Sequence, residues 1–122
     1  NMKDAVDLYN TMTIKIPIET KQGVHTLPAS SVIAVEAQGR KVVIHTTQRD
    51  FESIRNMQYW LELLPKNCFF QTHRSFIINF EHVTDFDRTL VHMADEQFHA
   101  YLTKRKYCAF KEAYLLYLDS TR

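Results

Sequence analysis

Short segments rich in β-branched and aromatic residues follow one another through most of the chain, and turns of only a few residues separate them. In the first half they cover residues 13–18, 24–27, 31–37, 41–46 and 50–52. In the second half they cover residues 68–72, 76–80, 83–87, 89–93 and 97–102. Connections this short join antiparallel neighbours, whereas parallel strands need a crossover of about a dozen residues or more. The sequence therefore predicts a mainly β fold of successive antiparallel hairpins.

One segment in the middle of the chain changes to the three- and four-residue spacing of an amphipathic helix. Its apolar positions are Ile54, Met57, Trp60, Leu61 and Leu64. Ser53 is a candidate N-cap, because its hydroxyl can accept a hydrogen bond from the first helical turn. Pro65 ends the pattern, since proline disfavours a helical residue before it. We expect one central helix between the two groups of hairpins.

A second helix is expected at the C-terminus, starting near Thr103. One face carries Tyr107, Phe110, Tyr114 and Tyr117, with Leu115 and Leu118 close to it. This aromatic face could dock the helix on the core, form a dimer contact or offer a platform for stacking bases. Aromatic residues at helical spacing most often dock a helix on the core, and we expect this role here.

The length and composition indicate one ordinary globular domain. The chain has 122 residues, of which 45% are hydrophobic and 24% charged. We expect residues 1–12 to be a linker end, a cloning remnant or a short helix, residues 13–118 to be the domain, and 119–122 to be a tail. No apolar run approaches the roughly 20 residues of a membrane-spanning helix, and the start lacks the layout of a secretory signal. These features favour a cytoplasmic protein that does not contact the membrane.

Few residues offer catalytic or cofactor chemistry. Only two glycines occur, so a glycine-rich phosphate loop is excluded. Cys68 and Cys108 lack the pairwise spacing of a zinc site and are interpreted as free, mostly buried thiols. The acidic residues near histidines fall in and beside hairpin turns, where solvated carboxylates are normal; they are Asp85, Asp87 and Asp95, near His82 and His92. We expect no enzyme activity and no cofactor.

The six histidines give no clear metal-ligand pattern. None of them forms an i, i+4 pair inside a predicted helix. His92 and His99 could oppose each other across a hairpin, but a single chance pairing is weak. We therefore predict no metal site.

The net charge of +1 conceals an uneven distribution of charge. Residues 98–111 contain four cations and no acidic residue, whereas residues 81–96 contain five acidic residues and only Arg88 as a cation. Three of the cations, residues 104–106, stand near the expected start of the last helix. Exposed cations there oppose the helix dipole at a cost of roughly 0.3–1 kcal/mol each, which an anion such as a DNA phosphate would reverse. A plain solvated charge run is the alternative.

The stretch Phe69-Phe70-Gln71-Thr72-His73-Arg74-Ser75-Phe76-Ile77-Ile78-Asn79 resembles the central signature of the LytTR (LytR/AlgR-type) DNA-binding domain. That signature has an aromatic pair, a His-Arg-Ser or similar triplet, an apolar trio and an asparagine. The flanking segments 31–37, 46–64 and 100–105 agree with the family in order and distance, and the likeness covers roughly residues 13–118.

The resemblance implies small antiparallel β-sheets stacked in an elongated domain, whose loops enter successive major grooves. The implied function is sequence-specific binding of double-stranded promoter DNA, as the output module of a bacterial transcription regulator. Family members usually follow a receiver domain that a histidine kinase phosphorylates, and this chain contains no receiver. We expect a dimer on DNA and leave open a monomer in solution. A protein- or RNA-interaction module on the same β scaffold is the alternative.

Arg74 is the first candidate for a DNA contact, because its planar fork can bond two acceptors of a guanine edge or two phosphate oxygens. The alternative is a solvated turn arginine, or one paired with Glu36 or Asp50. His73 could donate to a phosphate or pack beneath the loop. Asn79 is expected to be a buried amide with a structural role.

The resemblance adds residues from two further basic turns to the candidate DNA contacts. Arg40 and Lys41 align with the first DNA-contacting loop of the family, although an ordinary polar turn is nearly as good an interpretation. Thr103 and Lys104 stand where the family commonly has a Ser-Arg pair. Lysine provides a point charge and no fork, so three alternatives stay open: Lys104 makes the basic contact, Arg105 takes over the base readout, or the base readout is lost.

Overall fold

The computed structural model describes residues 2–121; Asn1 and Arg122, the outermost residues of the predicted linker and tail, lie outside them. Its helices are α1 (Met2–Met12), α2 (Met57–Leu63) and α3 (Tyr107–Ser120). Its strands are β1 (Lys15–Thr20), β2 (Gly23–Pro28), β3 (Val32–Gln38), β4 (Lys41–Thr46), β5 (Asp50–Ser53), β6 (Phe69–His73), β7 (Phe76–Asn79), β8 (Val83–Phe86), β9 (Leu90–Met93) and β10 (Phe98–Tyr101). Three short 3₁₀ turns are η1 (Ala29–Ser31), η2 (Phe80–His82) and η3 (Lys104–Lys106).

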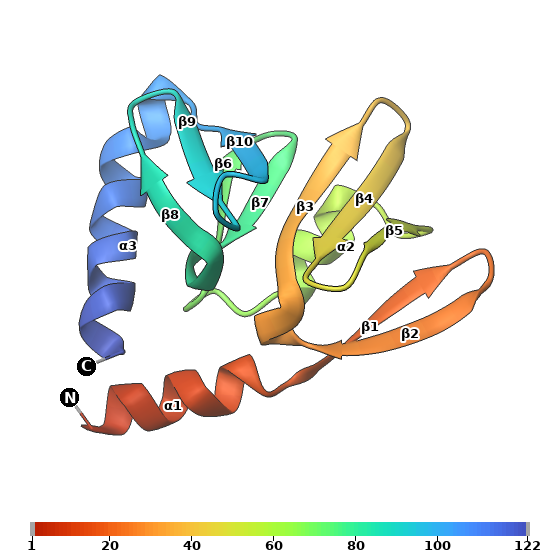
Figure 1. The fold of residues 1–122 in the computed structure, drawn as a ribbon, viewed down its shortest axis with the longest axis horizontal. Helices are drawn as coiled ribbons and strands as arrows, with labels where there is room; N and C mark the ends of the chain where they lie inside the picture. The colour runs from red at the N-terminus through yellow and green to blue at the C-terminus, as the bar shows by residue number, and fades with distance from the viewer. Residues whose placement is uncertain (1, 122) are drawn as a thin grey trace.

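The strands form three antiparallel sheets, which confirms the predicted mainly β fold (Figure 1). A central sheet has the order β5-β4-β3-β7-β6, a second contains β1 and β2, and a third has the order β10-β9-β8. The first and second halves of the chain meet where β3 pairs with β7, with Val35 opposite Ile77. Two of the three residues of β3 that pair with β7, Ala34 and Val35, are fully buried. The central sheet therefore holds both halves in one body.

The central helix begins later than the sequence predicts. Asn56, not Ser53, is the N-cap, and its side chain accepts a hydrogen bond of 2.9 Å from the backbone N–H of Tyr59. Ser53 belongs to β5 instead, and its hydroxyl accepts a 3.0 Å hydrogen bond from the buried Trp60 indole. Ile54, expected on the apolar face, is 56% exposed. The strand continues through Ser53 because its cross-strand partner on β4 is still available there.

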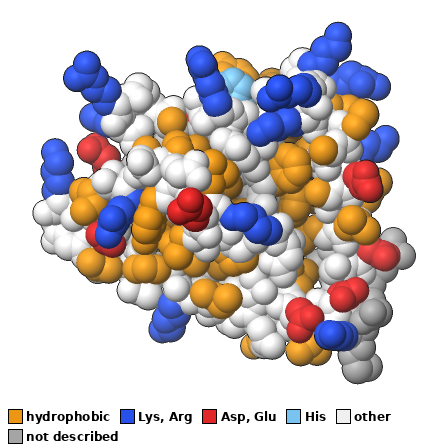
Figure 2. All heavy atoms as spheres, turned by 180° about the vertical axis from the view of Figure 1, so that it is seen from behind, with side chains coloured by type: hydrophobic (Ala, Val, Ile, Leu, Met, Phe, Trp, Pro, Cys, Tyr) orange, Lys and Arg blue, Asp and Glu red, His pale blue; other side chains and the backbone are white. Residues whose placement is uncertain are grey.

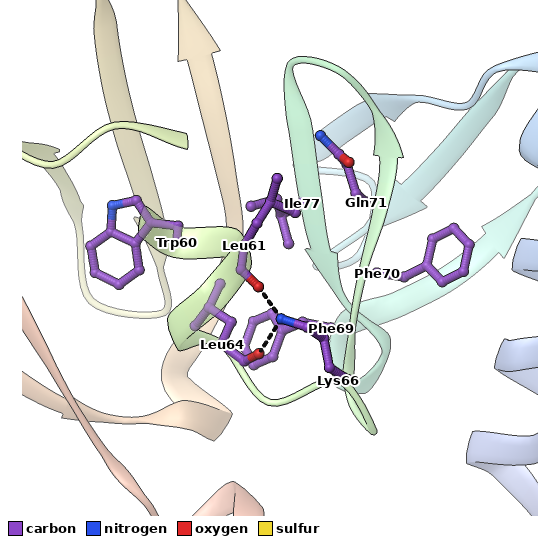
Figure 3. A pocket seen from close by; sticks show the side chains of 8 residues that line it. All are labelled: Trp60, Leu61, Leu64, Lys66, Phe69, Phe70, Gln71 and Ile77. Atoms are coloured by element: carbon purple, nitrogen blue, oxygen red, sulfur yellow. Dashed lines mark hydrogen bonds between the residues drawn. The ribbon is translucent and has the colours of Figure 1, made fainter. Parts of the chain in front are cut away.

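The end of α2 packs against β6 and β7 across an apolar hollow of about 270 Å³ (Figure 3). Trp60 and Leu64 line it from the helix side, and Phe69 and Ile77 line it from the strands. The Lys66 ammonium reaches back across the opening and donates to the backbone oxygens of Leu61 and Leu64. Carbonyl groups at a helix end lack partners within the helix, so this lysine stabilises the end of α2.

The aromatic face of α3 docks the helix on the core, as expected. Phe110 is fully buried and Tyr117 is nearly so. Their rings lie against Phe80, with centroids 5.7 and 5.4 Å away. The outward flank of the helix carries the exposed Leu115, Leu116 and Leu118 together with the charged residues Lys111, Glu112 and Asp119.

The first residues of the chain form the helix α1 and pack against η1 and α3. Leu8 and Met12 are buried in this contact. The side chain of Asn67 also donates to the hydroxyl of Thr11, at 3.2 Å. A short helix was one of the three alternatives for this segment, and the structure has a helix there. Within residues 2–121, no helix is both long and apolar enough to cross a membrane.

Asn79 ties the end of β7 to the start of β3. Its fully buried side chain donates to the backbone oxygens of Ala29 and Val32, at 3.2 and 2.8 Å. Its oxygen accepts a 2.9 Å hydrogen bond from the backbone N–H of Glu81, at the start of η2. The expected structural role of this amide is confirmed.

We predict that Asn79→Ala lowers the free energy of unfolding by about 3 kcal/mol, because it removes three hydrogen bonds to buried or partly buried backbone groups. Urea denaturation followed by circular dichroism measures this change. Asn67→Ala is the matched control, since its amide makes an exposed contact. An equal loss of stability in both variants would contradict the role assigned to Asn79.

The two thiols differ in environment, so the expectation of mostly buried thiols holds only for Cys68. Burial, aided by the nearby Glu81, raises the pKa of Cys68 to about 12. Cys108 is exposed on α3.

We predict that a thiol reagent at pH 8 modifies Cys108 rapidly and leaves Cys68 intact until the protein unfolds, because the thiolate is the reactive form. Mass spectrometry of peptides after timed labelling measures both rates. Comparable labelling of the two cysteines in the folded protein would show that the core around Cys68 opens readily.

Candidate nucleic-acid interface

Three turns that carry basic residues lie along the same edge of the molecule (Figure 1). They are the β3–β4 turn, the β6–β7 turn and η3 at the start of α3. The backbone N–H of Ala37 donates to the oxygen of Ser75 at 2.9 Å, which joins the first turn to the second. The N–H of Thr103 donates to the oxygen of Thr72 at 3.0 Å, which joins the third to the second. We call this set of turns the basic edge.

Arg74 lies at the tip of the β6–β7 turn and is exposed. Within residues 2–121, its guanidinium forms neither a hydrogen bond nor an ion pair. The two suspected partners, Glu36 and Asp50, face His45 instead. The interpretation of Arg74 as half of an ion pair is therefore wrong, and its fork is available to a ligand.

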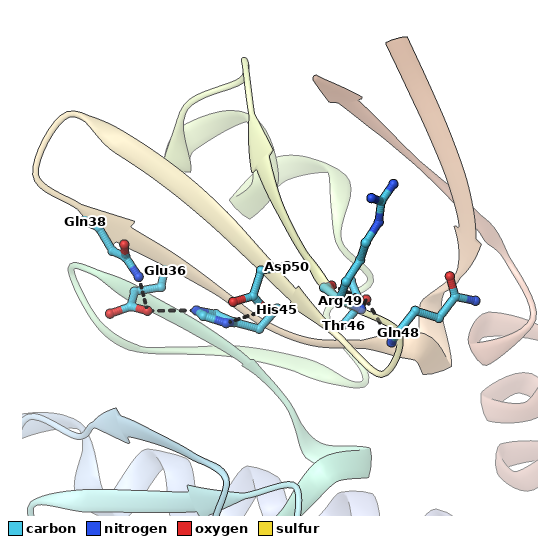
Figure 4. Close-up of polar contacts among 7 residues, drawn as sticks. All are labelled: Glu36, Gln38, His45, Thr46, Gln48, Arg49 and Asp50. Atoms are coloured by element: carbon cyan, nitrogen blue, oxygen red, sulfur yellow. Dashed lines mark hydrogen bonds and ion pairs between the residues drawn. The ribbon is translucent and has the colours of Figure 1, made fainter. Parts of the chain in front are cut away.

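His45 holds these two carboxylates in the middle of the central sheet (Figure 4). Its Nε2 lies 2.8 Å from Oε1 of Glu36, and its Nδ1 lies 3.0 Å from Oδ1 of Asp50. Gln38 also donates to the Glu36 carboxylate, at 2.9 Å. Glu36, which pairs with Phe76 beside the β6–β7 turn, is thus engaged by His45, and neither carboxylate contacts Arg74.

His73 packs beneath the turn that presents Arg74. Its Nδ1 accepts a 3.0 Å hydrogen bond from the backbone N–H of Ser75. The ring also contacts Phe76 and Tyr101, with centroids 6.0 and 5.8 Å away. Of the two alternatives for His73, these contacts favour the packing role.

Arg40 and Lys41 are exposed in the β3–β4 turn. Gly39 precedes them with a φ of +64°, a left-handed conformation that glycine adopts without steric cost. Lys41 lies 3.8 Å from the Glu52 carboxylate, and both side chains are well exposed. Exposed pairs of this kind contribute little free energy, so this pair holds Lys41 in place only weakly.

The α-helix at the C-terminus starts at Tyr107, later than the sequence predicts. Residues 104–106 form the 3₁₀ turn η3 in front of it. These cations therefore lie outside the first turn of the α-helix, where the helix dipole acts most strongly. Lys104 and Arg105 are exposed. Lys106 is not, since its ammonium donates to the backbone oxygen of Gln71 at 3.0 Å. Partial burial, together with the neighbouring Arg105, lowers the pKa of Lys106.

A hollow of about 370 Å³ opens between the second and third turns of the basic edge. Its lining consists of Gln71, His73, Arg74, Thr103, Arg105 and Lys106. Figure 2 shows Lys and Arg side chains gathered along the same edge when the molecule is seen from behind. The predicted site residues Arg40, Lys41, His73, Arg74, Lys104 and Arg105 all belong to the three joined turns. Arg49 does not, because it follows the opposite end of β4.

Arg88 lies close to the third turn of the basic edge, although it is not among the site residues predicted from the sequence. Its guanidinium lies over the Tyr107 ring, 4.5 Å from the centroid, at the start of α3. The β8–β9 turn is held there by the backbone N–H of Leu102, which donates to Thr89 at 2.9 Å. The available signal was that Arg88 is the only cation among the acidic residues of 81–96.

A family model of the LytTr DNA-binding domain matches residues 22–115, which is most of the chain and includes all three turns. The chain belongs to the LytTR family. A solved LytTr DNA-binding domain from Bacillus cereus has the same fold, with a TM-score of 0.68 and 26% sequence identity. That match covers 81% of this chain and 94% of the Bacillus cereus chain. LytTR is a family of DNA-binding domains and not a family of enzymes.

Two curated relatives contain a similar segment. The sensory transduction protein LytR of Staphylococcus epidermidis is 29% identical over 80 residues, which is 66% of this chain and 32% of the relative. The transcriptional regulatory protein NatR of Bacillus subtilis is 29% identical over 105 residues, which is 82% of this chain and 45% of the relative. The chain thus spans less than half the length of the curated relatives that it matches.

In this LytTR domain, Lys106 fixes η3 to β6, whereas its neighbour Lys104 makes no such contact. We predict that Lys106→Ala lowers the free energy of unfolding by about 1 kcal/mol, since it removes a charge-assisted hydrogen bond to a backbone oxygen. Lys104→Ala removes the same charge and is expected to leave stability unchanged. Urea denaturation of the two variants checks the difference, and equal stabilities would contradict the anchoring role of Lys106.

Proposed function

We propose that this LytTR domain binds double-stranded promoter DNA in a sequence-specific manner, with its turns inserted into successive major grooves. The observation that carries the proposal is the main-chain link between three basic turns. Because the bonds Ala37–Ser75 and Thr103–Thr72 join backbone atoms, the fold sets the spacing of the turns independently of side-chain rotamers. Turns whose backbone is already fixed lose less conformational entropy on binding, which favours a stable complex.

The helices are poorly suited to reading bases. α2 is only seven residues long and has Trp60 buried in the core. The outward flank of α3 carries three exposed leucines, which lack the donors and acceptors that recognise base edges, and no exposed arginine, asparagine or glutamine. The exposed arginines lie on the turns instead, so we infer that the turns carry the specificity.

The residues of the basic edge differ in their proposed roles. Arg74 and Arg105 have exposed guanidinium groups, which suit bidentate contacts with guanine or with two phosphate oxygens. Arg40, Lys41 and Lys104 are proposed to bind phosphates and set the register on the duplex. The contacts of His73 favour a role in supporting the turn rather than in touching DNA.

We further infer that the domain is the output module of a bacterial transcription regulator. The names of the relatives, a sensory transduction protein and a transcriptional regulatory protein, support this inference. In such a regulator a receiver domain elsewhere in the protein would take the signal from a histidine kinase. We propose that two copies bind as a dimer on DNA, while the free domain is a monomer in solution.

The proposal predicts that Arg74→Ala weakens binding to a cognate duplex by about tenfold or more, the loss expected for one bidentate base contact. The duplex is first obtained by selecting bound sites from a random library, and affinity is then measured by fluorescence anisotropy at several salt concentrations. Lys21→Ala is the control, because it removes an exposed cation from the β1–β2 turn, away from the basic edge.

The salt series separates the two contacts open to Arg74. If it holds a phosphate, Arg74→Ala weakens binding to all duplexes alike and lowers the salt slope by about one unit. If it reads a base, only the cognate duplex loses affinity. Equal affinities of the Arg74 and Lys21 variants would overturn the proposal. Tighter binding to single-stranded RNA than to duplex DNA would favour the alternative of an RNA-interaction module.

A further inference from the structure

The solvent-facing side of the third sheet carries a row of metal-ligating residue types. Asp85 on β8 is the cross-strand partner of His92 on β9, and His92 is in turn the partner of His99 on β10. Residues on the opposite face of the same sheet are fully buried: Val91, Met93 and Ala100. Because side chains alternate along a strand, Asp85, His92 and His99 lie together on the face that the core does not use.

The contact between Asp85 and His92 is close but is not a hydrogen bond. Nδ1 of His92 lies 2.8 Å from Oδ1 of Asp85. That nitrogen is shielded from solvent, yet it has no hydrogen-bond partner among residues 2–121, since the geometry around it does not meet the requirement for one. The His99 ring lies against His92, with centroids 4.6 Å apart, and limits how the His92 ring can turn.

The β9–β10 turn adds a second carboxylate to this pair. Ala94, Asp95 and Glu96 all have positive φ angles, of 51°, 55° and 68°, and the chain therefore turns back sharply above the sheet. One ligand atom each from Asp85, His92 and Glu96 lies within 4.8 Å of the others. Three potential ligands from β8, β9 and the turn thus converge on one point.

We propose that Asp85, His92 and Glu96 form a surface site for a divalent transition-metal ion of the Zn²⁺ class. One imidazole nitrogen and two carboxylate oxygens are a donor set that Zn²⁺ accepts in proteins, whereas Ca²⁺ and Mg²⁺ prefer oxygen alone. Two ligand atoms on one tetrahedral Zn²⁺ ion lie roughly 3.4 Å apart, given bond lengths of about 2.0–2.2 Å. His92 and Asp85 form an ion pair without hydrogen-bond geometry, and a metal ion between their ligand atoms would replace this contact after a shift of less than about 1 Å.

This inference differs from the prediction made from the sequence, which found no metal site. From the sequence Asp85 was already placed near His92, but there was no reason to add Glu96 to them. The register of three strands and the left-handed turn bring them together. The site lies apart from the basic edge, so the inference does not depend on the proposed function.

The test uses the domain free of any histidine tag and treated with a chelator. We expect one equivalent of Zn²⁺ to bind in isothermal titration calorimetry, and Co²⁺ to give a visible absorption spectrum of a low-symmetry site. The variants His92→Gln, Asp85→Asn and Glu96→Gln should each lower the affinity for Zn²⁺ by about tenfold or more, because each removes a direct ligand. Circular dichroism verifies that each variant is folded.

Two variants are matched controls. Asp95→Asn removes a carboxylate next to Glu96 in the same turn, and His25→Gln removes a histidine from β2. Both should bind Zn²⁺ as the unmodified domain does. The proposal is overturned if the domain binds no Zn²⁺, or if the controls lose as much affinity as the three ligand variants.

Discussion

The pairing of β3 with β7 is the contact on which the rest of the domain depends. It joins a hairpin from the first half of the chain to the signature segment of the second half, with Glu36 opposite Phe76 at the end nearest the turns. Asn79 closes the other end of β7 by bonding to Val32 at the start of β3. A slip of one residue in this pairing would move every side chain to the other face and would bury Arg74 or expose the core.

The same sheet also separates opposite charges. His45 faces two carboxylates from neighbouring strands, so Glu36 and Asp50 are engaged within the sheet. The cations, in contrast, are on the turns where the strands end. A net charge of +1 is therefore compatible with an edge of strongly positive potential, because charge arrangement, not the total, determines how a surface attracts an anion.

Much of the fold could be predicted from the sequence, because alternation and turn residues are local signals. Strand positions, the buried Asn79 and the exposed Arg74 all follow from such signals. Ser53 was misassigned because a hydroxyl that could cap a helix instead belongs to a strand and accepts from Trp60. The anchoring of Lys106 could not be predicted, since its partner Gln71 is 35 residues away in the chain and is brought close only by packing.

The central claim is that three basic turns, fixed by the sheets, contact one duplex together. The most direct measurement is a titration of the isotope-labelled domain with the selected duplex, followed by NMR at each backbone amide. The account predicts that the largest changes occur in residues 38–41, 73–75 and 103–106, with little change in α1 or in the outward flank of α3. Changes concentrated in those helices, or absent from any one of the three turns, would contradict it.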